Sequence, residues 1–215
     1  MNASLKQVII YGTFLTAIVG CGQNKTQPAT LGANSSSHTW IYLGGLTQEM
    51  DSPEETRNKK ILDQIGKKLN IKILAIPYFD RCEKANYKLC WLHYTHAQTL
   101  ETYDKILKVV EGEKISGFIG FSNGGFFLNQ LAQLRDLKHP IISIGAAGTL
   151  GSPSCANTLT MIVGKSEVIY PVAKKFFEDG KNSSLSLTFI SHEGGHIFPP
   201  QTVEVALTQY AKSKL

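Results

Sequence analysis

The chain has 215 residues, of which 42% are hydrophobic and 18% are charged, a balance typical of a globular protein with one domain and a sizeable core. Its formal net charge is +5 at pH 7, but the lysines and arginines form no dense run. We therefore expect a solvated surface and no nucleic-acid partner.

Residues 1–20 differ from the rest of the chain. Lys6 precedes the apolar stretch Val8 to Val19, which is too short to cross a bilayer as a helix but has the length of a signal-peptide core. We expect residues 1–20 to be a signal peptide and the mature protein to be exported.

The signal segment ends at a cysteine. Ile18-Val19-Gly20-Cys21 resembles the bacterial lipobox, which directs lipidation of its cysteine. Residues 22–38 are rich in Ser, Thr, Asn, Gln and Gly, as expected of a flexible tether. The sequence therefore predicts a lipidated Cys21 and a tether over residues 21–38, and so a membrane-anchored lipoprotein of the bacterial periplasm or outer membrane. An ordinary signal peptide followed by an incidental cysteine is the alternative.

From residue 39 onward, short apolar runs alternate with amphipathic segments. We expect strands at Thr39–Leu43, Ile71–Ile76, Ile115–Phe121, Ile141–Ala146, Leu159–Val163 and Leu185–Ile190. We expect helices at Pro53–Leu69, His96–Val110, Gly125 to about Leu134, Val172–Asp179 and Val203–Lys212. This alternation predicts one α/β domain over residues 39–215, with a mostly parallel sheet of about six strands and helices on both faces.

Export changes how the remaining cysteines are interpreted, because disulfides persist in oxidising compartments. Cys82 and Cys90 are the favoured pair, since the short segment between them keeps them close in any conformation. Cys155 would then be free, although the sequence alone does not exclude it as a partner.

Two connections bear on access to the site. The segment from Gly148 to Thr158 is too short for an inserted lid domain, so we expect an open site. Residues 79–94 look irregular and long for a connection, and they carry Tyr87, Trp91 and Tyr94. These aromatic residues either form a substrate wall pinned by the Cys82–Cys90 bridge or seal an edge of the core.

Ser122 is the residue with the most informative context. It lies in Gly120-Phe121-Ser122-Asn123-Gly124, directly after an apolar strand and directly before a helix. Small residues two before and two after a serine let the backbone turn sharply and lift the hydroxyl clear of the sheet, as in a nucleophile elbow. Glu167 follows the next but one strand and His196 follows the last strand, which is the serine, acid, histidine order of the α/β-hydrolases.

Two blocks of sequence, residues 117–125 and 192–199, resemble the small lidless serine hydrolases of the α/β-hydrolase superfamily, especially the family serine hydrolases and the dienelactone-hydrolase and phospholipase/carboxylesterase types. The resemblance spans roughly residues 39–212. It implies that Ser122 is the nucleophile and His196 the general base. Glu167 takes the place of the acid, where aspartate is the commoner residue.

The resemblance also implies an oxyanion hole made by the backbone N–H groups of Leu46 and Asn123. Gly44 stands where the family usually has histidine. The expected function is cleavage of a small-molecule or lipid carboxylic ester through an acyl-enzyme, without a metal or organic cofactor. Thioesterase or lysophospholipase activity is the alternative reaction, and a catalytically inactive binding lipoprotein on the same fold is the alternative of another class.

Two histidine patterns suggest metal binding and need a different explanation. His192-Glu193-Gly194-Gly195-His196 fits the zinc-protease pattern H-E-x-x-H, which requires a helix so that both histidines share a face. Two consecutive glycines oppose a helix at about 1 kcal/mol each, and an apolar strand runs straight into the motif. His93 and His96 lack acidic or cysteine companions, so we expect surface or loop positions for them.

Overall fold

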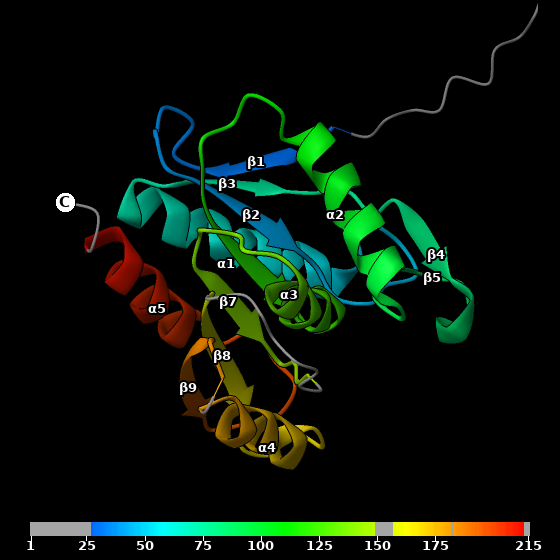
Figure 1. Ribbon diagram of the computed structural model, residues 1–215. Coiled ribbons are helices and arrows are strands. Elements are labelled where there is room, and N and C mark those ends of the chain that lie inside the picture. The colour runs from blue at the N-terminus through cyan, green and yellow to red at the C-terminus, as the bar shows by residue number, and fades with distance from the viewer. Residues whose placement is uncertain (1–26, 149–156, 182, 213–215) are drawn as a thin grey trace, which may run out of the picture.

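The computed structural model describes residues 27–148, 157–181 and 183–212. A seven-stranded sheet forms its centre (Figure 1). The strands are β1 Ala29–Gly32, β2 Thr39–Leu43, β3 Lys72–Ala75, β6 Ile115–Phe121, β7 Ile141–Ile144, β8 Thr158–Gly164 and β9 Ser186–His192. The helices are α1 Pro53–Leu69, α2 His96–Val109, α3 Asn123–Leu134, α4 Tyr170–Gly180 and α5 Pro200–Lys212.

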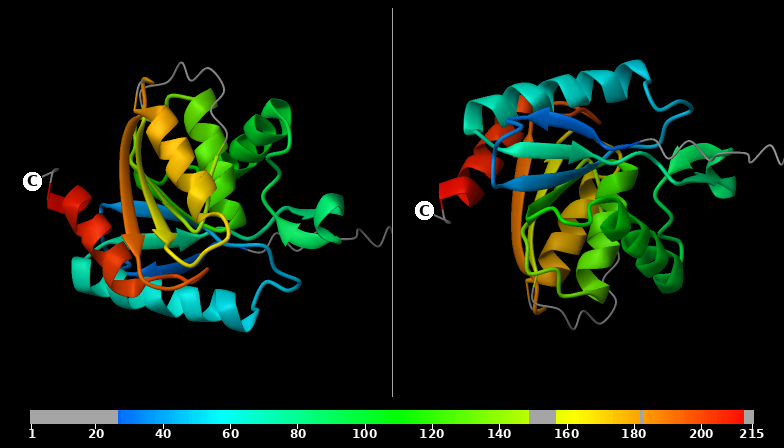
Figure 2. Two further views of the ribbon diagram at one scale, coloured as in Figure 1. Left: turned by 90° about the horizontal axis from the view of Figure 1, so that it is seen from below. Right: turned by 90° about the horizontal axis from the view of Figure 1, so that it is seen from above.

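The strand order in this sheet is β1-β3-β2-β6-β7-β8-β9. All neighbouring pairs are parallel except β1 with β3. Helices α1 and α5 cover one face, and α2, α3 and α4 cover the other (Figure 2). A separate hydrophobic core fills each interface, so the predicted parallel sheet with helices on both faces is confirmed.

The seventh strand corrects the predicted tether. The polar composition of residues 22–38 predicts a tether over residues 21–38, but residues 29–32 form β1 and pair antiparallel with β3, Ala29 opposite Ala75. The Gly32 N–H also donates to Asp63 Oδ1 at 3.0 Å. A short edge strand buries little of its surface, so its composition resembles that of a linker and hides the strand from sequence analysis.

Residues 79–94 are more regular than the sequence predicts. Strands β4 Asp80–Cys82 and β5 Lys88–Cys90 form an antiparallel hairpin around a short 3₁₀ turn. The predicted disulfide between Cys82 and Cys90 is confirmed, and both cysteines are buried. The isolated bridge between Thr47 and Leu89 joins this hairpin to the segment after β2.

The predicted α1 is confirmed at both ends. The Ser52 side chain caps the start by accepting the Glu55 N–H at 3.3 Å, and Asn70 ends the helix in the left-handed conformation. Helices α4 and α5 begin at Tyr170 and Pro200, a few residues earlier than the periodicity of the sequence predicts.

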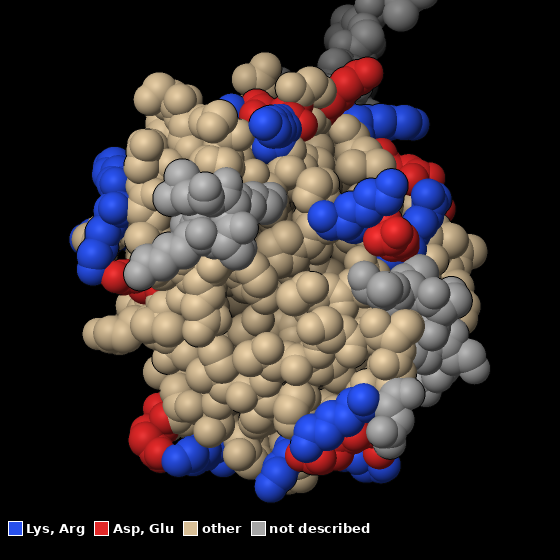
Figure 3. Space-filling model, turned by 60° about the vertical axis from the view of Figure 1, so that its left-hand side comes forward, with Lys and Arg blue, Asp and Glu red and all other residues tan. Residues whose placement is uncertain are grey.

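Several expectations fall outside the described residues. They include the signal peptide, the lipidated Cys21, Cys155 and most of the connection between Gly148 and Thr158. Within the described part of the chain there is no inserted lid domain, and none of the helices there is both long and apolar enough to span a bilayer. On the face shown in Figure 3, acidic and basic side chains lie together around the margin, and the centre carries neither.

Candidate active site

Ser122 lies at the sharp turn between β6 and α3 and has a backbone φ of 52° with ψ of −116°. This conformation is strained for a residue with a side chain, and such strain concentrates at functional sites. The chain is packed so closely at this turn that the positions two before and two after Ser122 both require glycine. A Cβ on Gly120 would lie 2.5 Å from the Gly124 carbonyl, and one on Gly124 would collide with the Leu43 carbonyl. The predicted nucleophile elbow is therefore the geometry that the chain adopts.

Glu167 and His196 come together at the carboxyl ends of β8 and β9. The distance from His196 Nδ1 to Glu167 Oε2 is 2.8 Å. The Glu167 side chain is only 1% exposed, and its other oxygen accepts the Gly164 N–H at 2.8 Å. Glu167 is thus a buried partner of the imidazole.

Backbone hydrogen bonds join the loops that carry these two residues. The Lys165 N–H donates to the His192 carbonyl and the Ser166 N–H donates to the Gly194 carbonyl, both at 2.9 Å. Because each loop holds the other, the carboxylate and the imidazole are fixed in one relative position.

The His196 ring also packs beside the elbow. It stacks on Phe121 with ring centroids 5.1 Å apart, and Phe121 directly precedes Ser122. The hydrogen bond to Glu167 raises the pKa of His196 above its ordinary value of 6.5, against the opposite effect of partial burial. No hydrogen bond joins Ser122 Oγ to His196 among the described residues. Catalytic hydrogen bonds are often loose without substrate and shorten in the reacting complex.

One of the two expected oxyanion donors belongs to the elbow, and the other belongs to the loop after β2. Asn123 is the first residue of α3, where a backbone N–H has no partner within the helix. Leu46 belongs to the loop after β2, and its neighbour Gly45 approaches Ser122 closely, since a Cβ on Gly45 would lie 3.2 Å from Ser122 Cβ. Within the described residues neither N–H has a hydrogen-bond acceptor. Both donors are therefore free for an oxyanion.

Trp91 connects these two donor segments. Its backbone N–H donates to Asn123 Oδ1 at 2.6 Å, and its indole Nε1 donates to the Gly44 carbonyl at 3.0 Å. The side chain is fully buried against Tyr78 and Phe127. Trp91 is therefore part of the core, and the idea that it lines a substrate wall is wrong. Tyr87 and Tyr94 are exposed.

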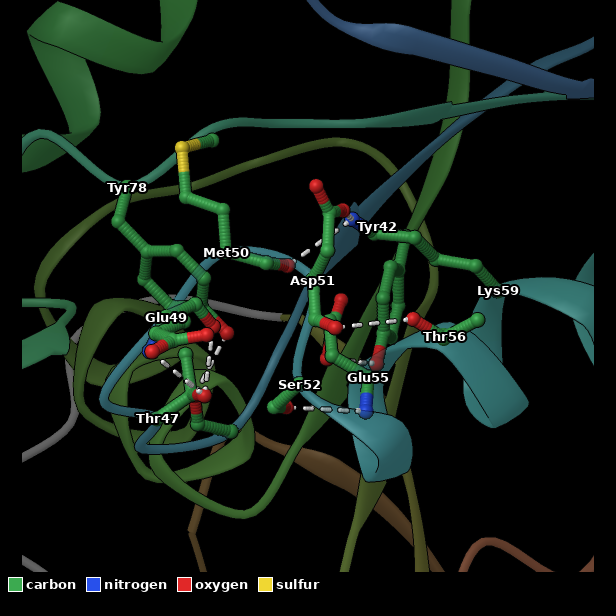
Figure 4. A network of polar contacts seen from close by, with 11 residues as sticks. Tyr42, Thr47, Glu49, Met50, Asp51, Ser52, Glu55, Thr56, Lys59 and Tyr78 are labelled. Carbon is green, nitrogen blue, oxygen red and sulfur yellow. Dashed lines mark hydrogen bonds and ion pairs between the residues drawn. The ribbon is translucent and has the colours of Figure 1, made fainter.

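Glu55 is a residue of this region that sequence reasoning missed. It is buried, accepts a hydrogen bond from the Tyr42 hydroxyl at 3.2 Å (Figure 4), and touches Gly44. Burial raises the pKa of Glu55 to about 7. Ser52 and Glu55 have capping-box spacing, yet the Ser52 N–H donates to the Glu49 carbonyl at 3.4 Å rather than to Glu55. The signal in the sequence was an acidic residue on the apolar side of α1.

The histidine patterns do not form metal sites. His192 ends β9 and His196 lies in the loop that follows, so the two do not share a helical face. His93 stacks between Tyr94 and Phe126, and burial lowers its pKa. Across residues 27–148, 157–181 and 183–212, no group of three or more His, Cys, Asp or Glu side chains could hold a metal ion.

No protein-family model matches this chain, and no curated protein matches it either. Solved structures do match. A carboxylesterase from Mesorhizobium loti has a TM-score of 0.65 at 15% identity and covers 84% of this chain and 93% of its own. The esterase PE8 has a TM-score of 0.63 at 14% identity, with 86% and 98% covered. A Bacillus cereus carboxylesterase has a TM-score of 0.60 at 14% identity, with 86% and 93% covered.

These similarities extend over most of each chain, and at such low identities they concern the fold. This chain itself has the mostly parallel sheet and the sharp strand-to-helix turn after β6 that characterise the α/β-hydrolase fold. The protein therefore has the α/β-hydrolase fold, in a form without a lid domain among its described residues.

Proposed function

We propose that this protein is a serine esterase that hydrolyses carboxylic esters through an acyl-enzyme. The observation that carries the proposal is the buried Glu167 carboxylate 2.8 Å from Nδ1 of His196, whose ring stacks beside the strained Ser122 elbow. The esterases among the structural neighbours support the same class of reaction.

In the proposed mechanism, Ser122 Oγ bonds to the ester carbonyl carbon while His196 Nε2 takes the hydroxyl proton. The carbonyl π electrons move to oxygen, and the N–H groups of Leu46 and Asn123 stabilise the resulting oxyanion. The tetrahedral intermediate collapses, the C–O bond to the alcohol breaks, and His196 protonates the departing alkoxide. Water then attacks the acyl-enzyme in the same way and releases the carboxylic acid.

Glu167 would keep the His196 proton on Nδ1 and stabilise the imidazolium that forms when Nε2 accepts the serine proton. A carboxylate accepts but does not donate hydrogen bonds, so its position 2.8 Å from Nδ1 favours the tautomer with a free Nε2 lone pair. That tautomer is the one a general base requires.

A double-mutant cycle on ester hydrolysis tests the proposal. Ser122→Ala and His196→Ala should each lower kcat by up to about 10⁶, and the double variant should be scarcely worse than either single one, because the two residues act as a unit. His192→Ala is the matched control and should leave most of the activity. Independent, multiplicative losses would contradict the proposed pairing.

We further propose that the protein is exported and anchored by lipid on Cys21, as the lipobox-like Ile18 to Cys21 supports. Each buried CH₂ of an acyl chain adds about 0.8 kcal/mol of membrane affinity, and several chains are needed for stable anchoring. The intact mass of the mature protein tests this. We expect the mature protein to begin at a lipid-modified Cys21, and we expect no lipid on the Cys21→Ser variant. An unmodified Cys21 in the wild type would contradict the proposed anchor.

A further inference from the structure

Two aromatic side chains hold the loop that carries Leu46. The Tyr78 hydroxyl donates to the Gly45 carbonyl at 2.6 Å, and the Trp91 indole donates to the Gly44 carbonyl at 3.0 Å. The two rings lie against each other with centroids 5.1 Å apart. Tyr78 follows β3, so its hydroxyl reaches the loop from a separate strand end.

The contact with Gly45 determines more than the position of a carbonyl. Gly45 O and the Leu46 N–H belong to one peptide group, which is planar and trans. In such a group the C=O and N–H bonds point in opposite directions. A hydroxyl held at the Gly45 oxygen therefore determines the direction in which the Leu46 N–H points.

We propose that Tyr78 is the positioning residue of the oxyanion hole, because its hydroxyl holds the Gly45–Leu46 peptide with the Leu46 N–H directed at the reacting carbonyl oxygen. This inference rests on the proposed esterase function. Within the described residues, Tyr78 forms no hydrogen bond with Ser122 or His196. It acts through the peptide that it holds.

The surroundings of Tyr78 keep its hydroxyl protonated, so that it always donates a hydrogen bond. Burial raises the pKa of its hydroxyl well above the ordinary value of 10, and the Glu55 carboxylate adds to this effect. The hydroxyl also occupies the space where a Cβ on Gly44 would lie, so the loop and the tyrosine fit only while position 44 is glycine. Tyr78 also lines a cavity of about 200 Å³ together with Glu55 and Lys59, and none of Ser122, Glu167 and His196 lines it.

Glycine at position 44 explains why this chain needs such a residue. Two glycines in succession leave the loop backbone with more conformational freedom than other residues would. A donor on the Gly45 carbonyl removes that freedom before substrate arrives, and preorganised donors are what stabilise an oxyanion effectively. The Thr47–Leu89 bridge, whose two hydrogen bonds have nitrogen to oxygen distances of 3.3 and 2.7 Å, holds the loop just beyond Leu46.

Tyr78→Phe tests the inference, because it removes the hydroxyl and keeps the ring packed on Trp91. We expect kcat for ester hydrolysis to fall about 10- to 100-fold, less than the 10²–10³ for deleting an oxyanion donor outright. KM should change by less than about 2-fold, because the hydrogen bond from the Leu46 N–H to the substrate oxygen strengthens only in the transition state. Tyr210→Phe removes a hydroxyl that lies 2.7 Å from Thr160 Oγ1 and is the matched control.

A transition-state analogue separates positioning from packing. A trifluoromethyl ketone forms a tetrahedral adduct with the active serine. Its inhibition constant should therefore increase in Tyr78→Phe by the same factor by which kcat falls. Incorporation of 4-aminophenylalanine at position 78 restores a donor and should recover most of kcat. Melting curves establish that each variant is folded at the assay temperature.

The outcomes distinguish the inference from the function on which it rests. An active wild type with a Tyr78→Phe kcat within 2-fold would overturn the inference and leave the esterase intact. Loss of kcat without the parallel loss of ketone affinity would also overturn it, because packing alone would then explain the effect. A wild type that hydrolyses no ester and binds no ketone would mean that the proposed function is wrong, and the inference falls with it.

Discussion

Glu167 binds His196 through one carboxylate oxygen, at 2.8 Å from Nδ1, while its side chain is only 1% exposed. Glutamate therefore reaches the imidazole from the position where the family more often has aspartate. The second oxygen accepts the Gly164 N–H at 2.8 Å, which accommodates the longer side chain by bending it back over its own loop.

Glu167→Gln should lower kcat by about 10³- to 10⁴-fold with the fold preserved, because an amide cannot stabilise the imidazolium. Steady-state ester hydrolysis and a melting curve measure both effects. Glu193→Gln, which removes an exposed carboxylate paired with Lys165 in the neighbouring loop, is the control. Activity of Glu167→Gln within about threefold of wild type would show that Glu167 is not the acid of the triad.

The pH dependence of kcat/KM should follow His196. The imidazole accepts the serine proton only when neutral, so activity should rise with pH through a midpoint above 6.5, since the hydrogen bond to Glu167 raises the pKa of His196. Removing that carboxylate should move the midpoint of the residual activity to lower pH. An unchanged midpoint in Glu167→Gln would mean that the two residues are not coupled.

Glu55 should make the folded state less stable as pH rises. Its pKa is raised from 4.5 to about 7 in the folded protein by burial, partly opposed by Lys59 and the Tyr42 hydroxyl and reinforced by Glu54 and Asp51. The folded state then binds a proton that the unfolded state has released, so the free energy of unfolding falls between about pH 4.5 and 7 and levels off above. The expected total is about 3 kcal/mol.

Glu55→Gln tests this dependence by urea unfolding from pH 4 to 8. The variant should lose the decrease between pH 4.5 and 7 and be more stable than wild type at pH 8. Glu101→Gln, which removes an exposed carboxylate from α2 that takes no part in the pKa shift of Glu55, is the matched control. The opposite result would be a free energy of unfolding that rises across this range in the wild type and in Glu55→Gln alike. It would show that the pKa of Glu55 is not raised in the folded protein.

The disulfide should stabilise the loop of the oxyanion hole as well as the fold. Reduction of Cys82–Cys90 releases a short loop and should lower the free energy of unfolding by about 2–3 kcal/mol. Because Leu89 is hydrogen-bonded to Thr47, we also expect a lower kcat at temperatures where the reduced protein is still folded. The double variant Cys82→Ser/Cys90→Ser is the test. An unchanged kcat would show that the disulfide of the hairpin does not affect the loop of the oxyanion hole.

The local features of the site were predictable from sequence because they depend on neighbouring residues. The glycines on either side of Ser122 permit the tight elbow, and the order of strands along the chain places Glu167 and His196 at the same sheet edge. The contacts of Tyr78, Trp91 and Glu55 join residues from 11 to 47 positions away. No local pattern predicts such contacts.

Edges and burial were harder to predict for the same reason. Strand β1 is short and largely exposed, and it is held by pairing with β3 and by the Gly32 hydrogen bond to Asp63. The ambiguity over Trp91 was one of burial, since an aromatic residue in a long connection can cover either a substrate or a core. Its hydrogen bonds to Gly44 and Asn123 resolve that ambiguity.

Covalent labelling tests most directly whether Ser122 is an activated nucleophile. A fluorophosphonate should add one phosphonyl group per molecule, located on Ser122 by peptide mass spectrometry, because only an activated serine attacks phosphorus at neutral pH. Ser122→Ala should remain unlabelled, and His196→Ala should label far more slowly. An unmodified wild-type mass after prolonged exposure, or a label on another residue that persists in Ser122→Ala, would show that Ser122 is not an activated nucleophile.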